Sequence, residues 1–136
     1  FFFAVYDPSM HNLVYVNAGH NPPFLLRNNA GDSSTCDRLK AGGAVIGLLP
    51  HTAYGEESLT LNPGDLLVLY TDGFSEAMTK DDEEWGEERM LAAVEAVRSK
   101  AAGEVISGLF EAADGFTQGA PQQDDMTLLT LKINAV

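Results

Sequence analysis

The stretch NPGDLLVLYTDG, residues 62–73, constrains the fold more than any other part of the chain. Its first four residues place Pro and Gly in the two central positions that a type II turn favours. We therefore predict a hairpin in which ESLTL at 57–61 pairs with an apolar strand over 66–72. That strand ends in a carboxylate, Asp72, and Gly73 follows at once. An Asp-Gly pair is common in ordinary turns, which is the favoured interpretation of this pair taken alone, and a metal or catalytic site at a strand end could explain it too.

The rest of the chain predicts strands first and helices second. Further runs rich in aromatic and β-branched residues, separated by turn residues, predict strands at 1–6, at 12–17, from about 24, and at 35–40. The glycine-rich stretch 41–55 is expected to be an ordered loop with one short strand. Apolar residues at helical spacing predict helices from Gly86 and from Gly103, and 124–133 returns to strand. This order implies one α+β domain over residues 1–136, with an antiparallel sheet and helices on one face.

Composition excludes several classes of partner and site. The net charge is −12, with only eight Lys and Arg residues, so the chain lacks the cations that binding a nucleic acid requires. No run approaches the roughly 18 apolar residues of a membrane span, so we expect no membrane insertion by this segment. The single Cys36 excludes an internal disulfide and a cysteine-based zinc site. It fits a reducing compartment, and we expect a cytoplasmic protein.

Carboxylates occur at two strand junctions that resemble each other. Asp72 closes one predicted strand, and Asp124 with Asp125 opens the last one. If these strands are antiparallel neighbours, the three carboxylates come to the same rim of the sheet. Like charges in proximity are costly unless a cation neutralises them, and Mg²⁺ or Mn²⁺ prefers such oxygen ligands. Gly73 would let backbone, water or substrate approach closely. Each acidic motif taken alone is equally typical of a turn.

Five pieces of the sequence stand in an order that a known family shares, and together they span nearly the whole chain. They are YVNAGHNPPFLL at 15–26, GGAVIGLLP at 42–50, LNPGDLLVLYTDGFSEAM at 61–78, WGEERML at 85–91 and QQDDMTLLTL at 122–131. In these pieces the chain resembles the metal-dependent serine/threonine protein phosphatases (the PPM family). The matching branch is bacterial and is typified by the stage II sporulation protein E and stress-response sigma-regulator phosphatases. The resemblance implies an antiparallel β-sandwich flanked by helices, in α-β-β-α layers.

The resemblance also implies a set of metal ligands. Asp72 matches the aspartate of the family's Asp-Gly metal motif, whose glycine is Gly73. Asp124 matches the metal aspartate near the C-terminus, and Asp125 stands where the family has Asp or Asn. By this resemblance the metal site contains these four residues, and the complete domain holds two Mn²⁺ or Mg²⁺ ions.

Two further residues are expected to support the site. Glu76 matches the recurrent Glu of the branch's Thr-Asp-Gly-x-x-Glu-Ala motif, in which Thr71 is the first residue. Reasoning from the residues alone assigns Glu76 no direct metal contact. The family's first metal motif, Asp-x-x-Gly-His-Gly, has no match in residues 1–136. We therefore expect the chain to be the C-terminal part of a catalytic domain, weakly active or inactive by itself.

The function implied by the resemblance is hydrolysis of phosphoserine or phosphothreonine on a regulatory protein of the anti-sigma-factor antagonist type. The family pattern further implies a sensor domain upstream, and a homodimer is compatible with it. A catalytically inactive, phosphatase-like binding module is the alternative, because the first metal motif is missing. A calcium site at DDEE, 81–84, is a third interpretation, but the spacing lacks the Asp-x-Asp-x-Asp-Gly pattern of an EF-hand loop.

Overall fold

The computed structural model describes residues 1–28 and 35–134, which form an α+β structure. The chain forms two compact units. Unit 1 comprises Phe1–Asp65 and the C-terminal residues from Ile133, and unit 2 comprises Leu66–Lys132. The strands of unit 1 are β1 (Phe2–Asp7), β2 (Asn12–Ala18), β3 (Phe24–Leu26), β4 (Cys36–Arg38), β5 (Gly42–Gly43) and β6 (Glu57–Thr60). Unit 2 contains β7 (Leu66–Tyr70), α1 (Asp72–Ser75), α2 (Gly86–Val97), α3 (Ala102–Thr117) and β8 (Leu128–Lys132).

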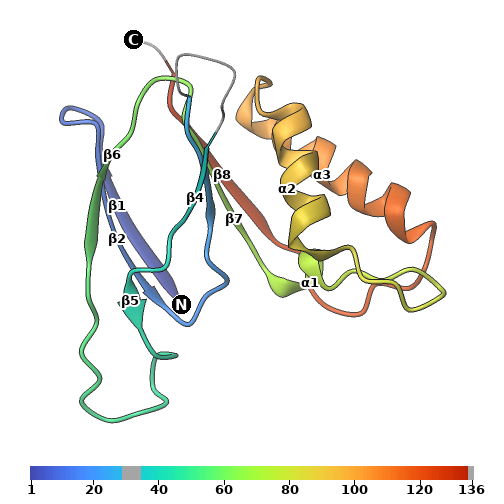
Figure 1. Cartoon of the computed structure of the whole chain (residues 1–136), viewed down its shortest axis with the longest axis horizontal. Coiled ribbons are helices and arrows are strands. Elements are labelled where there is room, and N and C mark those ends of the chain that lie inside the picture. Colours follow the sequence, from blue (N-terminus) through green and yellow to red (C-terminus); the bar gives the residue numbers. More distant parts are fainter. Residues whose placement is uncertain (29–34, 135–136) are drawn as a thin grey trace. The chain divides into compact units, whose positions relative to one another are not determined.

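In unit 1, strand β2 is the centre of one sheet (Figure 1). It pairs antiparallel with β1 and with β6, and β3 pairs antiparallel with β4. The hairpin predicted between 57–61 and 66–72 is wrong, because β6 pairs with β2 instead of β7. The short strand expected within 41–55 is present as β5, but it runs parallel to β2, with Asn17 opposite Gly42. At Gly42 the backbones are so close that an added Cβ would lie 1.7 Å from the carbonyl oxygen of Asn17. Only glycine fits this contact, which explains the glycine pair in the sequence.

The predicted type II turn precedes β7. Gly64 has a φ of +91°, and the Asp65 amide donates to the carbonyl of Asn62 at 2.9 Å, the geometry such a turn requires. The Asp65 side chain is 1% exposed, and its carboxylate accepts three hydrogen bonds. Their donors are the amides of Asn62 (2.9 Å) and Asn28 (2.7 Å) and Nη1 of Arg27 (3.2 Å). A buried carboxylate with this many partners holds the turn in place.

Unit 2 is built on the antiparallel β7–β8 ladder and a pair of helices. The two strands are antiparallel, with Leu66 opposite Lys132 and Tyr70 opposite Leu128. Helices α2 and α3 pack against each other (Figure 1). Their buried residues are Met90 and Val94 on α2 and Val105, Leu109 and Ala113 on α3. Met90, Val94, Val105 and Leu109 are among the helically spaced apolar residues from which these two helices are predicted. No helix in the described part of the chain is long and apolar enough to cross a membrane.

The strand boundaries next to the acidic residues differ from the sequence-based prediction. The strand predicted over 66–72 ends at Tyr70, and Asp72 begins the short helix α1. The physical reason is the side chain of Phe74, which is fully buried and meets the Phe110 ring edge-on at a centroid distance of 4.8 Å. Turning the chain into a helix brings Phe74 into this core. The strand predicted over 124–133 begins only at Leu128, so both aspartates precede it.

We predict that Asp65→Ala lowers the free energy of unfolding by about 3 kcal/mol, because it removes one acceptor of the mostly buried Arg27 and the carboxylate to which two backbone amides donate. Asp37→Ala is the matched control. Asp37 pairs with the same arginine at 2.8 Å, but its side chain is 50% exposed, so the loss should stay below about 1 kcal/mol. Urea denaturation of both variants measures the difference. Equal losses would contradict the assignment of Asp65 as the anchor of the turn.

Candidate metal centre

The loop that carries Asp72 is held by its own backbone and by the core beneath it. Asp72 is exposed, whereas the next three residues are buried. Its Oδ1 accepts from the Gly73 amide at 3.1 Å, and its carbonyl oxygen accepts from the Glu76 amide at 2.8 Å and the Ser75 hydroxyl at 3.2 Å. Phe74, buried beneath it, anchors the loop. The carboxylate of Asp72 is therefore presented to solvent from a backbone that has little freedom to move.

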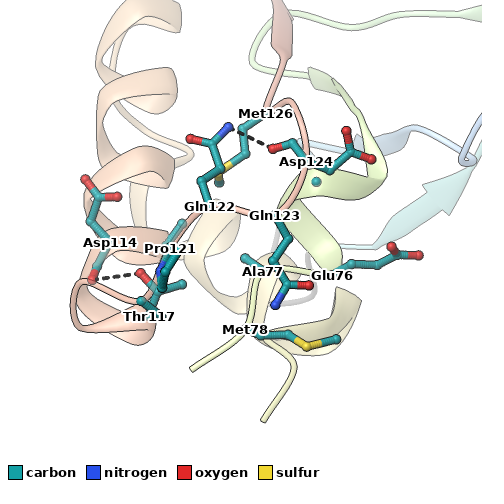
Figure 2. Close-up of a pocket in the computed structure, with 13 residues that line it drawn as sticks. Glu76, Ala77, Met78, Asp114, Thr117, Pro121, Gln122, Gln123, Asp124 and Met126 are labelled. Atoms are coloured by element: carbon teal, nitrogen blue, oxygen red, sulfur yellow. Dashed lines mark hydrogen bonds between the residues drawn. The ribbon is translucent and has the colours of Figure 1, made fainter. Parts of the chain in front are cut away.

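The second acidic loop lies between α3 and β8. Asp124 and Asp125 are both exposed. The Asp125 amide donates to Oδ1 of Asp124 at 2.7 Å, which orients that carboxylate. Nε2 of Gln122 donates to the Asp124 carbonyl at 2.7 Å, the bond drawn in Figure 2. One oxygen of the Asp124 carboxylate is thus engaged within its own loop, as one oxygen of Asp72 is in the other loop.

The two acidic loops touch at Gly73. A Cβ added there would lie 2.5 Å from the carbonyl oxygen of Asp125 and 3.2 Å from that of Asp124. The register of the strands explains the contact. Tyr70, the last residue of β7, lies opposite Leu128, the first residue of β8, so the segment after β7 and the segment before β8 lie at the same end of the ladder. The predicted antiparallel pairing is confirmed, and it places both loops at the same end of the ladder. The role of these aspartates as metal ligands stays a prediction.

The two supporting residues have different surroundings. Thr71 lies between β7 and α1, and its hydroxyl donates to the carbonyl of Asp125 at 2.8 Å. Glu76 follows α1, is exposed and lines a pocket. The structure therefore brings Thr71 into direct contact with the second acidic loop and places Glu76 beside it.

The pocket has a volume of about 100 Å³ and lies against the acidic loops. Its walls are the segment after α1 (Glu76–Met78), the end of α3 and the loop leading to β8, and both Gly73 and Asp124 line it. In Figure 2 the side chains of Glu76 and Asp124 lie at one end of the pocket, and those of Asp114 and Thr117 lie at the other. Sequence reasoning did not identify Gln122 and Gln123 as lining residues. Their position directly before Asp124 is the signal that could have indicated them.

The donors present suit a hard divalent cation. In residues 1–28 and 35–134, no three His, Cys, Asp or Glu side chains are grouped so that they could hold a metal ion together. What the structure does bring together is two loops that touch at Gly73, one carrying Asp72 and the other Asp124. Mg²⁺ is commonly bound through one or two carboxylates, with waters and substrate oxygens completing its coordination. The residues fit such an ion.

Comparison with protein families gives a match over nearly the whole chain. The family model for stage II sporulation protein E (SpoIIE) matches residues 1–134. Protein IcfG of Synechocystis sp. (strain ATCC 27184 / PCC 6803 / Kazusa) is 35% identical over 133 residues. That match covers 98% of this chain and 20% of IcfG. The phosphoserine phosphatase RsbU of Bacillus subtilis (strain 168) is 34% identical over 80 residues, which cover 59% of this chain and 23% of RsbU.

Comparison with solved structures gives the same fold. The SiaA-PP2C domain of Pseudomonas aeruginosa matches with a TM-score of 0.78 at 19% identity. The match covers 98% of this chain and 51% of that one. The α+β phosphatase fold predicted from the sequence is thereby confirmed. The chain spans about a fifth of IcfG and less than a quarter of RsbU.

We predict that Gly73→Ala destabilises the protein by about 1–3 kcal/mol, because its methyl group would press on backbone atoms that cannot rotate away. Gly103→Ala in the first turn of α3 is the control. Nothing lies within 4 Å of its added Cβ, and the substitution should be neutral or stabilising by up to about 1 kcal/mol. Thermal unfolding of both variants tests this. A Gly73→Ala protein as stable as the wild type would contradict the close approach of the loops.

Proposed function

Because the chain belongs to the stage II sporulation protein E family, we propose that it is part of a metal-dependent phosphatase. Its substrate is phosphoserine or phosphothreonine on a regulatory protein, of the anti-sigma-factor antagonist type. The observation that carries the proposal is the contact between the Asp72 loop and the Asp124–Asp125 loop at Gly73, beside an open pocket. The similarity to RsbU, a phosphoserine phosphatase, supports the choice of substrate class.

Asp72 and Asp124 are the proposed ligands of a Mn²⁺ or Mg²⁺ ion, and Asp125 supports them. When bound, such an ion neutralises charge on phosphoryl oxygens and lowers the pKa of a coordinated water. The protein's own contribution is positional. Each loop fixes one carboxylate oxygen through a backbone amide, and Gly73 keeps the space between the loops free of side-chain atoms.

The charge of unit 2 explains why a cation is needed. Residues 66–132 contain fourteen acidic and five basic side chains, and the residues lining the pocket include no Lys or Arg. A phosphate group carries one to two negative charges near neutral pH, so this surface repels it in the absence of a cation. A divalent ion held by Asp72 and Asp124 would cancel their two negative charges and would give a phosphoryl oxygen a cation to contact.

The pocket is the proposed location of the residues that flank the phosphorylated side chain. Met78, Met126 and Pro121 provide apolar surface, and Gln122, Gln123 and Thr117 provide hydrogen-bonding groups. A mixed lining of this kind suits a short peptide segment rather than a purely apolar ligand. Two carboxylates alone should hold Mn²⁺ weakly, so the 136-residue chain by itself should bind the ion loosely and turn over substrate slowly or not at all.

The remaining proposals concern the protein of which this chain is part. We propose a cytoplasmic enzyme with a sensor domain upstream of the catalytic domain and a homodimer as its assembly. The 20% coverage of IcfG is compatible with additional domains of this kind.

We predict Mn²⁺-dependent hydrolysis of an aryl phosphate by a protein extended upstream by about one hundred residues, a typical missing-domain length. The 136-residue chain should show little or none. In the extended protein, Asp72→Asn should reduce kcat/KM by about 100-fold or more. Loss of a residue that only hydrogen-bonds to a metal ligand typically costs 10- to 100-fold in activity, and loss of the ligand itself should cost more.

Glu95→Gln is the matched control, since this carboxylate is exposed on α2 and does not line the pocket. It should retain activity within about threefold, because removing one exposed charge costs less than about 1 kcal/mol. An extended protein that hydrolyses nothing, with or without Mn²⁺, would reject the phosphatase. Binding of a phosphopeptide without turnover would then establish the binding module instead.

A further inference from the structure

We propose that the hydroxyl of Thr71 is a positioning group that sets the spacing between the two proposed metal carboxylates, and so determines the affinity for the cation. The proposal rests on the function proposed above. In it the hydroxyl does not contact the cation but holds the two acidic loops at a fixed distance. Thr71 precedes Asp72 directly, and its hydroxyl bonds to the other acidic loop.

The Thr71 hydroxyl both donates and accepts across the gap between the loops. Its Oγ1 donates to the carbonyl oxygen of Asp125 at 2.8 Å and accepts from the amide of Thr127 at 2.9 Å. The Thr71 amide adds a third bond, to the carbonyl of Thr127 at 3.1 Å. The second acidic loop is therefore tied to the first on both sides of Met126, through one side chain.

The position of the bonds explains why they bear on the carboxylates. Thr71 is one residue away from Asp72, and Asp125 is one residue away from Asp124. The carbonyl of Asp125 that accepts the hydroxyl proton is the same atom that lies 2.5 Å from the Cβ position of Gly73. Steric contact with Gly73 limits how closely the loops approach, and the hydroxyl bond limits how far they separate. Together they fix one distance.

The choice of side chain at this position follows from its chemistry. A serine would retain both hydrogen bonds, because only the hydroxyl takes part in them. Valine has nearly the same shape but would leave the Asp125 carbonyl and the Thr127 amide without this partner. Groups that hold metal ligands in place typically account for 10- to 100-fold in metal affinity, so the two substitutions should have clearly different effects.

The test compares Thr71→Val, Thr71→Ser and Thr130→Val in the upstream-extended protein. Thr130 is the matched control, because its hydroxyl also donates to a backbone carbonyl, that of Ala102 at 3.2 Å. This hydrogen bond does not involve the acidic loops. Two quantities are measured for each variant. One is the Mn²⁺ dissociation constant, from the electron paramagnetic resonance signal of free Mn²⁺. The other is hydrogen exchange of peptides covering 124–128 in metal-free protein, followed by mass spectrometry.

We expect Thr71→Val to accelerate exchange over 124–128 and to raise the Mn²⁺ dissociation constant by about tenfold or more. Thr71→Ser should match the wild type in both, and Thr130→Val should leave both unchanged. Unchanged exchange in Thr71→Val would overturn the proposal, as would a normal Mn²⁺ affinity despite faster exchange. A serine variant as impaired as the valine variant would overturn it too.

The two readouts separate this proposal from the one on which it rests. A wild-type protein that binds no Mn²⁺, or binds it equally well after Asp72→Asn, would reject the metal site and with it the tuning of affinity. The exchange data, collected without metal, would still decide whether the hydroxyl ties the loops together. Faster exchange and weaker Mn²⁺ binding in Thr71→Val, with both unchanged in Thr71→Ser and Thr130→Val, is the result expected if both proposals are correct.

Discussion

The antiparallel pairing of β7 with β8 is the constraint on which the candidate site depends. Because Tyr70 lies opposite Leu128, the residues that follow one strand and precede the other must meet at the same end of the ladder. Asp72 and Asp124 are 52 positions apart in the sequence, and the pairing of β7 with β8 brings the loops that carry them together. The backbone hydrogen bonds of two apolar strands thus supply most of the order that a two-carboxylate site requires, before any side chain at the site contributes.

Much of this could be predicted from the sequence, because it depended on local patterns. The type II turn at 62–65 follows from its Pro-Gly centre, and its positive φ at Gly64 is observed. The buried faces of α2 and α3 follow from helical periodicity. The parallel pairing of β5 and the end of β7 at Tyr70 could not be predicted in this way. The first depends on a backbone contact with Asn17, and the second on the burial of Phe74 against a helix far along the chain.

The candidate site, too, has features that could be predicted from the sequence and features that could not. The aspartates could be identified from motifs, and the antiparallel pairing was enough to place them at one edge. The pocket could not be predicted, since the end of α3 and the segment after α1 come together only through tertiary packing. The hydrogen bonds of Thr71 could not be predicted either, because nothing in the sequence around a threonine before an Asp-Gly pair indicates that its hydroxyl bonds to residue 125.

Bringing carboxylates of two loops together has an electrostatic cost, and the structure shows which interactions oppose it. Each carboxylate accepts a hydrogen bond from a backbone amide, which holds the carboxylate in its orientation. Beneath the first loop, Phe74 is in contact with the rings of Phe110 and Trp85, so moving Asp72 away would expose an aromatic cluster. In the absence of a cation, repulsion between the loops is therefore balanced by core packing on one side and by the Thr71 hydroxyl bonds on the other. Under the proposed function, these interactions would hold both loops in place before a cation binds, and the cation would then offset the repulsion between their carboxylates.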